Sequence, residues 1–175
     1  MLNVFPKPRH LGFSLIELLI GIAIMAILAG LAMPSFQTWL QNSQIRNAAE
    51  SVQNGLQRAR AEAVGRNTNV EFVLGAGSSW VVRLAGGANI DSRPSSEGSR
   101  DVTVVTDTGT TTVTFNNFGG LAATNLDASV PFTQVNLDSP MLAAADSQEL
   151  RVTIGVGGNV RMCDPGAPAS SPRAC

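Results

Sequence analysis

Few residues in this sequence could carry acid–base, nucleophilic or metal chemistry. The only histidine is His10, tyrosine is absent, and the two cysteines, Cys163 and Cys175, lie near the C-terminus. A Ser-His-Asp or Cys-His arrangement would have to use His10, which lies in a short basic N-terminal stretch. The sequence has too few histidine and cysteine residues to form a zinc site. It also contains no G-x-x-x-x-G-K-[ST] phosphate-binding loop. The sequence therefore predicts no enzyme, no cofactor, no metal site and no small-molecule substrate.

The charge content is low and unevenly distributed. Of 175 residues, 44% are hydrophobic and only 14% are charged, whereas soluble domains usually have about a quarter charged residues. Residues 1–12 contain Lys7 and Arg9 and no acidic residue, so they carry +2 of a net charge of −1, and the remainder carries −3. A chain of this length forms about one globular domain. It lacks the basic excess that is typical of general nucleic-acid binding.

The N-terminal region contains one long apolar segment. Leu18–Met33 is sixteen residues without a polar side chain, and extending it back to Phe13 gives twenty-one residues, which is about the length that spans a bilayer as a helix. Lys7 and Arg9 lie before this segment, and positively charged flanks usually stay in the cytoplasm. We therefore expect a cytoplasmic N-terminus and a periplasmic C-terminal part. A secretory signal peptide fits poorly, because the run is long, contains an acid and lacks a small-x-small cleavage site. A plain signal anchor stays open.

The residues at the start of this segment carry a specific motif. Gly12-Phe13-Ser14-Leu15-Ile16-Glu17 resembles the class III signal of type IV pilins and type II secretion pseudopilins. In that family a prepilin peptidase in the membrane cuts after the glycine, and the new N-terminal phenylalanine is N-methylated. The resemblance implies a removable leader of residues 1–12, with cleavage between Gly12 and Phe13, methylation of Phe13, and retention of the apolar segment.

Glu17 and Pro34 are the two unusual residues of the apolar region. A carboxylate inside a bilayer costs about 2.5–3.5 kcal/mol at its centre, less near an end, and usually marks a functional contact. The family resemblance gives Glu17 a partner, the amine of Phe13 in a neighbouring subunit; the alternative is a side chain that only reaches the interface. Pro34 predicts either a bend in the helix or its end. Many pilins have proline at this position, and the resemblance implies that the helix loosens there during assembly.

Beyond Pro34 the sequence pattern is that of a helix with one apolar face and polar residues on its other faces. Apolar residues recur at alternating spacings of 4 and 3, which predicts one buried stripe of a helix. We therefore expect one helix from about Phe13 to Arg66, with residues 13–34 in the membrane or filament core and residues 35–66 packed on a globular head. Gly55 costs this helix about 1 kcal/mol relative to alanine, and it marks either close packing or nothing. The stripe consists of Ile45, Ala49, Val52, Leu56, Ala59 and Ala63.

Residues 67–175 are rich in β-strand patterns. Two pairs of runs around glycine-containing turns predict hairpins, and residues 90–100 predict a loop. We expect an α+β fold of the type IV pilin-like kind, in which the long helix packs on an antiparallel β-sheet head. The predicted strands are 69–74, 79–84, 102–106, 111–115, 130–137, 149–154 and 159–163.

Several segments resemble one branch of this family, the minor pilins and pseudopilins of the GspH/FimU/FimT type. They are Leu56–Asn67, Trp80, Phe115–Gly120 and Val152–Cys163. The resemblance implies a subunit that primes or caps a type IV pilus or a type II secretion pseudopilus. Its partners would be other pilin subunits, the prepilin peptidase and lipid of the bacterial inner membrane. Membership of a pilus or of a pseudopilus stays open.

The C-terminus holds two further candidates. If the head lies in the oxidising periplasm, Cys163 and Cys175 are expected to form a disulfide, the alternative being two reduced, buried thiols. Some FimT-type proteins bind DNA through a basic G-R-x-R patch; here Asn159 replaces its first arginine. Arg161 and Arg173 remain as candidate DNA contacts, but two cations without an interleaved aromatic residue favour ordinary solvated charges. A DNA-uptake pilin and, more remotely, an anchored periplasmic enzyme are the alternative functions.

Overall fold

The computed structural model describes residues 13–175, so the predicted leader, including Gly12, lies outside the described residues. The chain divides into two compact units between Gln37 and Thr38. The first contains the apolar part of helix α1, and the second contains the rest of α1 and all eight strands. We refer to the second unit as the head.

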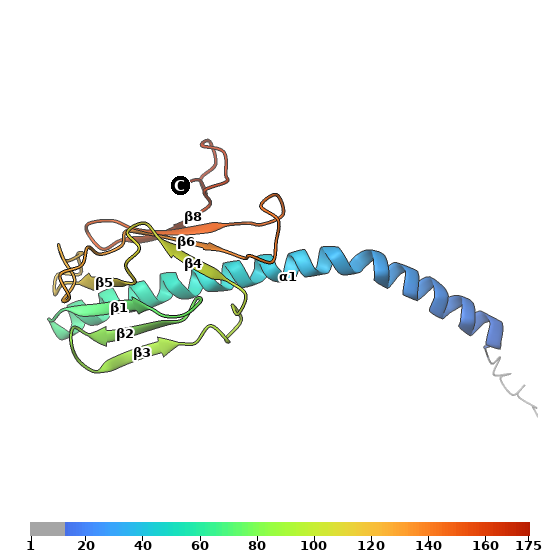
Figure 1. The fold of residues 1–175 in the computed structure, drawn as a ribbon, viewed down its shortest axis with the longest axis horizontal. Helices are drawn as coiled ribbons and strands as arrows, with labels where there is room; N and C mark the ends of the chain where they lie inside the picture. Colours follow the sequence, from blue (N-terminus) through green and yellow to red (C-terminus); the bar gives the residue numbers. More distant parts are fainter. Residues whose placement is uncertain (1–12) are drawn as a thin grey trace, which may run out of the picture. The chain divides into compact units, whose positions relative to one another are not determined.

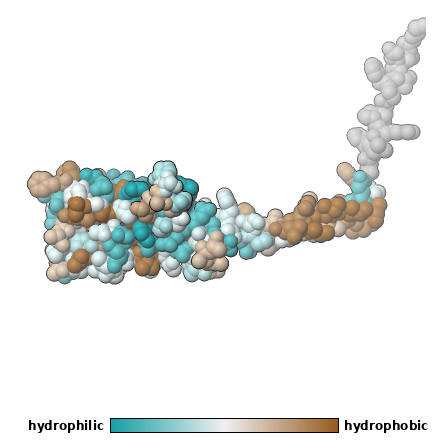
Figure 2. All heavy atoms as spheres, turned by 90° about the horizontal axis from the view of Figure 1, so that it is seen from above, coloured by the Kyte–Doolittle hydropathy of each residue, from teal (hydrophilic) through white to brown (hydrophobic). Residues whose placement is uncertain are grey.

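Helix α1 runs from Leu15 to Arg66 and contains Pro34. Residues 15–37 are exposed on every side of the helix, and Figure 2 shows a nearly continuous hydrophobic surface along this stretch. By length and composition, α1 is able to cross a membrane. A helix that is hydrophobic all round requires burial in a membrane or in a larger assembly. The predicted single helix is confirmed, and Pro34 does not end it.

Both ends of α1 are capped by its own sequence. The Ser14 hydroxyl accepts a hydrogen bond of 3.2 Å from the backbone N–H of Glu17, which is the N-cap contact of a Ser-x-x-Glu sequence. At the other end, Asn67 adopts a left-handed conformation with φ of 51°. The N–H of Thr68 donates to the carbonyl of Ala63, and the N–H of Asn67 to that of Val64. This pattern is a Schellman motif, so α1 ends at Arg66.

The head contains two four-stranded antiparallel sheets (Figure 1), in which β1 to β3 are seen below α1 and β4, β6 and β8 above it. Strand order is β3-β2-β1-β5 in one sheet and β4-β6-β7-β8 in the other. The strands are β1 Val70–Leu74, β2 Trp80–Leu84, β3 Asn89–Arg93, β4 Thr103–Thr106, β5 Thr112–Phe115, β6 Gln134–Asp138, β7 Leu150–Ile154 and β8 Val160–Cys163.

One hydrophobic core joins α1 and both sheets. All six residues of the predicted helix stripe are fully buried, and Ala48, Ser51 and Gly55 are buried beside them. Phe72 lies at the centre, with its ring centroid 5.7 Å from that of Trp80 and 6.4 Å from that of Phe132. The indole N–H of Trp80 donates a 2.8 Å hydrogen bond to the Ser51 hydroxyl. This satisfies the one polar group that the indole brings into the core.

The structure shows why α1 has glycine at position 55. A Cβ there would lie 2.7 Å from Phe72 Cε2 and 2.9 Å from Trp80 Cε2. Alanine would favour the helix by about 1 kcal/mol, but overpacking of a dense core costs about 1–3 kcal/mol. We therefore expect Gly55→Ala to lower the free energy of unfolding by up to about 2 kcal/mol, measured by denaturant titration of the full chain in detergent.

Gly65 provides the matched control, because a Cβ there would meet no atom within 4 Å. Gly65→Ala should leave stability unchanged or raise it by up to about 1 kcal/mol. Equal effects of the two substitutions would contradict the packing explanation.

Three strand predictions differ from the structure. The first predicted hairpin is confirmed, with Val70 opposite Leu84 and Leu74 opposite Trp80. The second is wrong: β4 pairs with β6 and β5 pairs with β1, so the glycine turn at 107–111 connects two sheets. The predicted loop 90–100 begins with most of β3, whose polar residues suit an exposed edge strand. The predicted strand 130–137 begins only at Gln134, as part of β6.

Candidate functional site

Two of the described residues of the predicted processing and assembly site, Phe13 and Glu17, lie at the start of α1. Phe13 is 87% exposed, immediately before the Ser14 cap. Glu17 is exposed in the first turn of the helix, where the positive end of the helix dipole favours a carboxylate. None of the ion pairs found within residues 13–175 involves Glu17. Sequence reasoning missed the Ser14 cap, although Ser-x-x-Glu before an apolar run indicates one.

Pro34 lies in the interior of α1, one residue beyond the sixteen-residue apolar run. Proline has no backbone N–H, so the hydrogen bond to the carbonyl of Gly30, four residues earlier, cannot form. The helix therefore lacks one backbone hydrogen bond at the point where its sequence changes from entirely apolar to apolar on one face only.

Two head loops are held by amide side chains of α1, near the point where the helix enters the head. The Asn42 amide donates to the Asp146 carbonyl at 2.9 Å and accepts from the Gln148 N–H at 2.8 Å. Gln44 accepts a 3.2 Å hydrogen bond from the N–H of Asp101. These contacts fix the loops that follow β6 and β3 against the helix.

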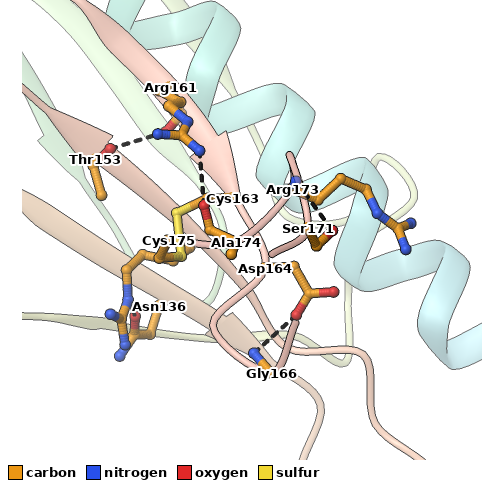
Figure 3. Close-up of a disulfide and its surroundings, with 11 residues drawn as sticks. Asn136, Thr153, Arg161, Cys163, Asp164, Gly166, Ser171, Arg173, Ala174 and Cys175 are labelled. Atoms are coloured by element: carbon orange, nitrogen blue, oxygen red, sulfur yellow. Dashed lines mark hydrogen bonds between the residues drawn. A yellow bond between two sulfur atoms is a disulfide. The ribbon is translucent and has the colours of Figure 1, made fainter. Parts of the chain in front are cut away.

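The C-terminal tail is joined to β8 by a disulfide between Cys163 and Cys175, whose Cα atoms are 5.1 Å apart (Figure 3). The N–H of Asp164 donates to the Arg173 carbonyl at 2.7 Å. The tail therefore folds back along the strand from which it leaves.

The two candidate DNA contacts are not brought together by this arrangement. The Arg161 guanidinium donates a 2.7 Å hydrogen bond to the Ala174 carbonyl, whereas the Arg173 side chain points away from it in Figure 3. Arg161 thus helps to hold the tail, and the two arginine side chains point in different directions.

Two glutamates of the head, Glu71 and Glu62, form ion pairs with arginine side chains. Glu71 is buried on β1 and accepts a 2.8 Å charge-assisted hydrogen bond from Arg83, its cross-strand neighbour on β2. The Arg66 hydrogen bond lowers the pKa of Glu62 against the opposing effect of burial, and Arg58 adds to the lowering. Within residues 13–175, no group of three or more His, Cys, Asp or Glu side chains could hold a metal ion.

Asp107, which follows β4, makes a pH-dependent contact with Thr133, which precedes β6. Its partial burial raises the pKa, but hydrogen bonds from the hydroxyl and N–H of Thr133 lower it more, so the net pKa is depressed. A carboxylate with a depressed pKa stabilises the fold above its unfolded pKa, and this contribution is lost as the pH falls through the folded value.

We therefore expect the stability difference between the native chain and Asp107→Asn to be largest near neutral pH and to shrink in acid, below a pH of about 4. Thermal unfolding midpoints across this range measure it. A difference that stays constant with pH would contradict the assignment.

Comparison with known proteins agrees with this architecture. The sequence model of the family described as Type II transport protein GspH matches residues 48–158, which is more than half of the chain. The chain belongs to the GspH family. The Prokaryotic N-terminal methylation motif matches residues 7–33, and so includes the predicted cleavage position and the apolar segment.

Individual proteins resemble this GspH-family chain only over part of its length or at low sequence identity. Over 69 residues it is 36% identical to a fimbrial protein of Moraxella nonliquefaciens, an alignment covering 35% of this chain and 45% of that protein. The chain thus matches less than half the length of this relative.

Two crystal structures of the type IV minor pilin FimU of Pseudomonas aeruginosa PAO1 have the same fold. The first, at 21% identity, has a TM-score of 0.52 and covers 75% of this chain and 94% of that one. The second has a TM-score of 0.51 at 20% identity, covering 74% and 98%. The predicted α+β fold, a long N-terminal helix packed on an antiparallel head, is confirmed.

Proposed function

We propose that this chain is a minor pilin or pseudopilin subunit that enters a type IV pilus or type II secretion pseudopilus, where it primes or caps the filament. The observation that carries the proposal is the methylation motif at residues 7–33, whose described residues include most of the exposed apolar part of α1. GspH-family membership and the FimU-like fold support the same role. The role is assembly rather than catalysis.

The chain is first an inner-membrane protein in this proposal. Lys7 and Arg9 hold the N-terminus in the cytoplasm by the positive-inside rule, and the head lies in the periplasm. The Cys163–Cys175 disulfide supports an oxidising compartment for the head. Prepilin peptidase removes residues 1–12, and residues 13–34 then remain in lipid until they transfer to the filament core.

Glu17 would direct that transfer. After cleavage, Phe13 carries a positively charged amine, and a pair with Glu17 of a neighbouring subunit neutralises both charges in a medium of low dielectric constant. Such a pair also sets the axial offset between two apolar helices, which have little else to fix their register.

The test compares incorporation of the full chain into sheared filaments. We expect Glu17→Ala to insert and be processed normally but to enter filaments less well, on the order of tenfold or more, the loss expected when one partner of a buried charge pair is removed. Incorporation of Glu17→Ala at the native level would refute the role.

Ser14→Ala separates charge pairing from helix capping. It removes the N-cap hydroxyl, worth about 1 kcal/mol, but keeps the carboxylate. We expect Ser14→Ala to assemble nearly normally. If it failed as severely as Glu17→Ala, capping of α1 would explain both variants and the pairing would be rejected.

A further inference from the structure

The end of the head where α1 enters it carries an apolar loop. Residues 139–149 connect β6 to β7, and residues 141–145 within them are five consecutive apolar residues. Met141 is 68% exposed, and the three alanines that follow Leu142 are exposed as well. An exposed apolar run of this length is unfavourable on a surface that faces only water, so it usually marks a contact. We call residues 141–145 the apolar tip.

The apolar tip is ordered and lies against α1. The Ser139 hydroxyl donates a 3.1 Å hydrogen bond to the Gln41 side chain and accepts one of 3.3 Å from the N–H of Met141. At the other end of the tip, the N–H of Asp146 donates to the Ala143 carbonyl at 2.9 Å. Apolar side chains held outward on an ordered loop lose little conformational entropy when they become buried.

Helix α1 is itself apolar at this level. Trp39 is 63% exposed and Leu40 is 43% exposed, and they directly precede Gln41. Long side chains in a helix point back toward its N-terminus, so these two cover the turn before them. In Figure 1 the loop between β6 and β7 lies at the end of the head where α1 enters. We call Trp39, Leu40 and the apolar tip together the entry surface.

By its position in the sequence, the entry surface falls at the edge of a bilayer. Residues 13–33 are twenty-one residues, or about 31 Å of helix, which matches a hydrocarbon core of about 30 Å. Trp39 is six residues beyond Met33, about 9 Å further along a helix. The headgroup layer extends about 5–8 Å beyond the core, and tryptophan is enriched in that layer. The entry surface is therefore continuous with the membrane segment.

The charges near the entry surface do not favour attraction to anionic lipid. Arg100 and Asp101, in the loop that follows β3, line a hollow together with Leu40, and Asp146 directly follows the apolar tip. These three side chains supply one positive and two negative charges. Contact with a membrane would therefore come from burial of apolar side chains rather than from a basic patch.

We propose that the entry surface docks the head onto the phospholipid bilayer that holds α1, with Trp39 and the apolar tip among the headgroups and upper acyl chains. The inference rests on the proposed function, because it requires residues 13–34 to lie in lipid, and it deepens that function. Docking fixes the height of the unassembled head above the membrane. The entry surface must then leave lipid when the subunit moves into a filament.

Quenching of tryptophan fluorescence tests the docking in the full chain, reconstituted in phosphatidylcholine vesicles with bromine on the upper acyl chains. The chain has two tryptophans, and Trp80 is buried at 7% exposure. In a Trp39→Phe background, Met141→Trp therefore reports on the apolar tip above a constant Trp80 signal. We expect bromine to lower the emission of this probe on the order of twofold or more. An unquenched probe, which would mean that the tip faces water or protein, would overturn the proposal.

Phe118→Trp in the same background is the matched control. Phe118 is 86% exposed, but the carbonyl of the neighbouring Gly119 accepts a hydrogen bond from Arg60 Nε. Arg60 is nineteen residues after Gln41, or about 28 Å along a helix. We expect no quenching at this position. Equal quenching at positions 118 and 141 would show that the head touches lipid without preference for the entry surface, and the proposal would fail.

Ala144→Asp tests whether apolar insertion holds the tip in lipid. A charge on the exposed tip should reduce the quenching of Met141→Trp on the order of several-fold, whereas Ala144→Ser should change it little. Addition of phosphatidylglycerol to the vesicles should also change it little. Quenching that survives Ala144→Asp, or that requires phosphatidylglycerol, would refute apolar docking.

Ile24→Trp, in the apolar segment of α1, separates this inference from the proposed function. If lipid brominated near the middle of the bilayer quenches Ile24→Trp while Met141→Trp stays unquenched, α1 spans the bilayer and only the docking of the head is rejected. If neither probe is quenched, the membrane insertion that the proposed function requires fails as well.

Discussion

Gly158→Ala is expected to destabilise the head by about 3–5 kcal/mol, since it combines backbone strain with overpacking. Gly158 has φ of 76°, a left-handed conformation that disfavours a side chain. A Cβ there would also overlap the carbonyl oxygen of Gly119 and approach Arg60 Nε to 3.2 Å. Because the overlap is with a backbone atom, no change of side-chain rotamer would relieve it.

The neighbouring residue supplies the control. A Cβ on Gly157 would meet no atom within 4 Å, so Gly157→Ala should change stability by no more than about 0.5 kcal/mol. Denaturant titration of the full chain in detergent, followed by far-ultraviolet circular dichroism, compares the two variants. Similar midpoints for the two variants would contradict the close packing of Gly158 against Gly119 and Arg60.

Loss of the disulfide is expected to lower the free energy of unfolding by about 3 kcal/mol, because the bond closes a loop and restricts the unfolded chain. The cysteines are twelve positions apart. Cys175 is exposed whereas Cys163 is buried at 4% exposure, so Cys175→Ser removes the bond without placing a new polar group in the core.

Reductant provides an independent route to the same state. The native chain with reductant and Cys175→Ser without it should unfold at the same midpoint, and reductant should not affect the variant. An unchanged midpoint in both samples would show that the bond contributes nothing to stability, and the contacts of Arg161 and Asp164 would then hold the tail alone.

Local patterns predicted the elements of this fold better than their pairing. The spacing of Ile45, Val52 and Leu56 identified the buried helix face, because periodicity depends only on neighbouring residues. Asp107-Thr108-Gly109-Thr110 indicated a turn, but a turn between sheets and a hairpin turn have the same local chemistry. The pairing of β5 with β1 joins residues 39 to 45 positions apart in the sequence.

For the candidate site, too, the local features were predictable from sequence and the features that depend on long-range folding were not. The motif at Gly12–Glu17 is contiguous, so sequence alone was enough to propose processing and retention of the apolar segment. The proximity of Val64 to Gly119 and of Val156 to Leu121 was missed, because it arises only through the folding of three separate segments. A single exposed Phe or Val in a sequence has no distinguishing pattern.

The central claim is that the chain is cut between Gly12 and Phe13 and keeps its apolar helix. Intact mass and N-terminal fragment spectra of the protein from membranes test it most directly. We predict a 163-residue chain that begins with Phe13 and carries one added methyl group on its N-terminal amine. A chain that still begins at Met1, or one that begins after the apolar segment, would contradict this account.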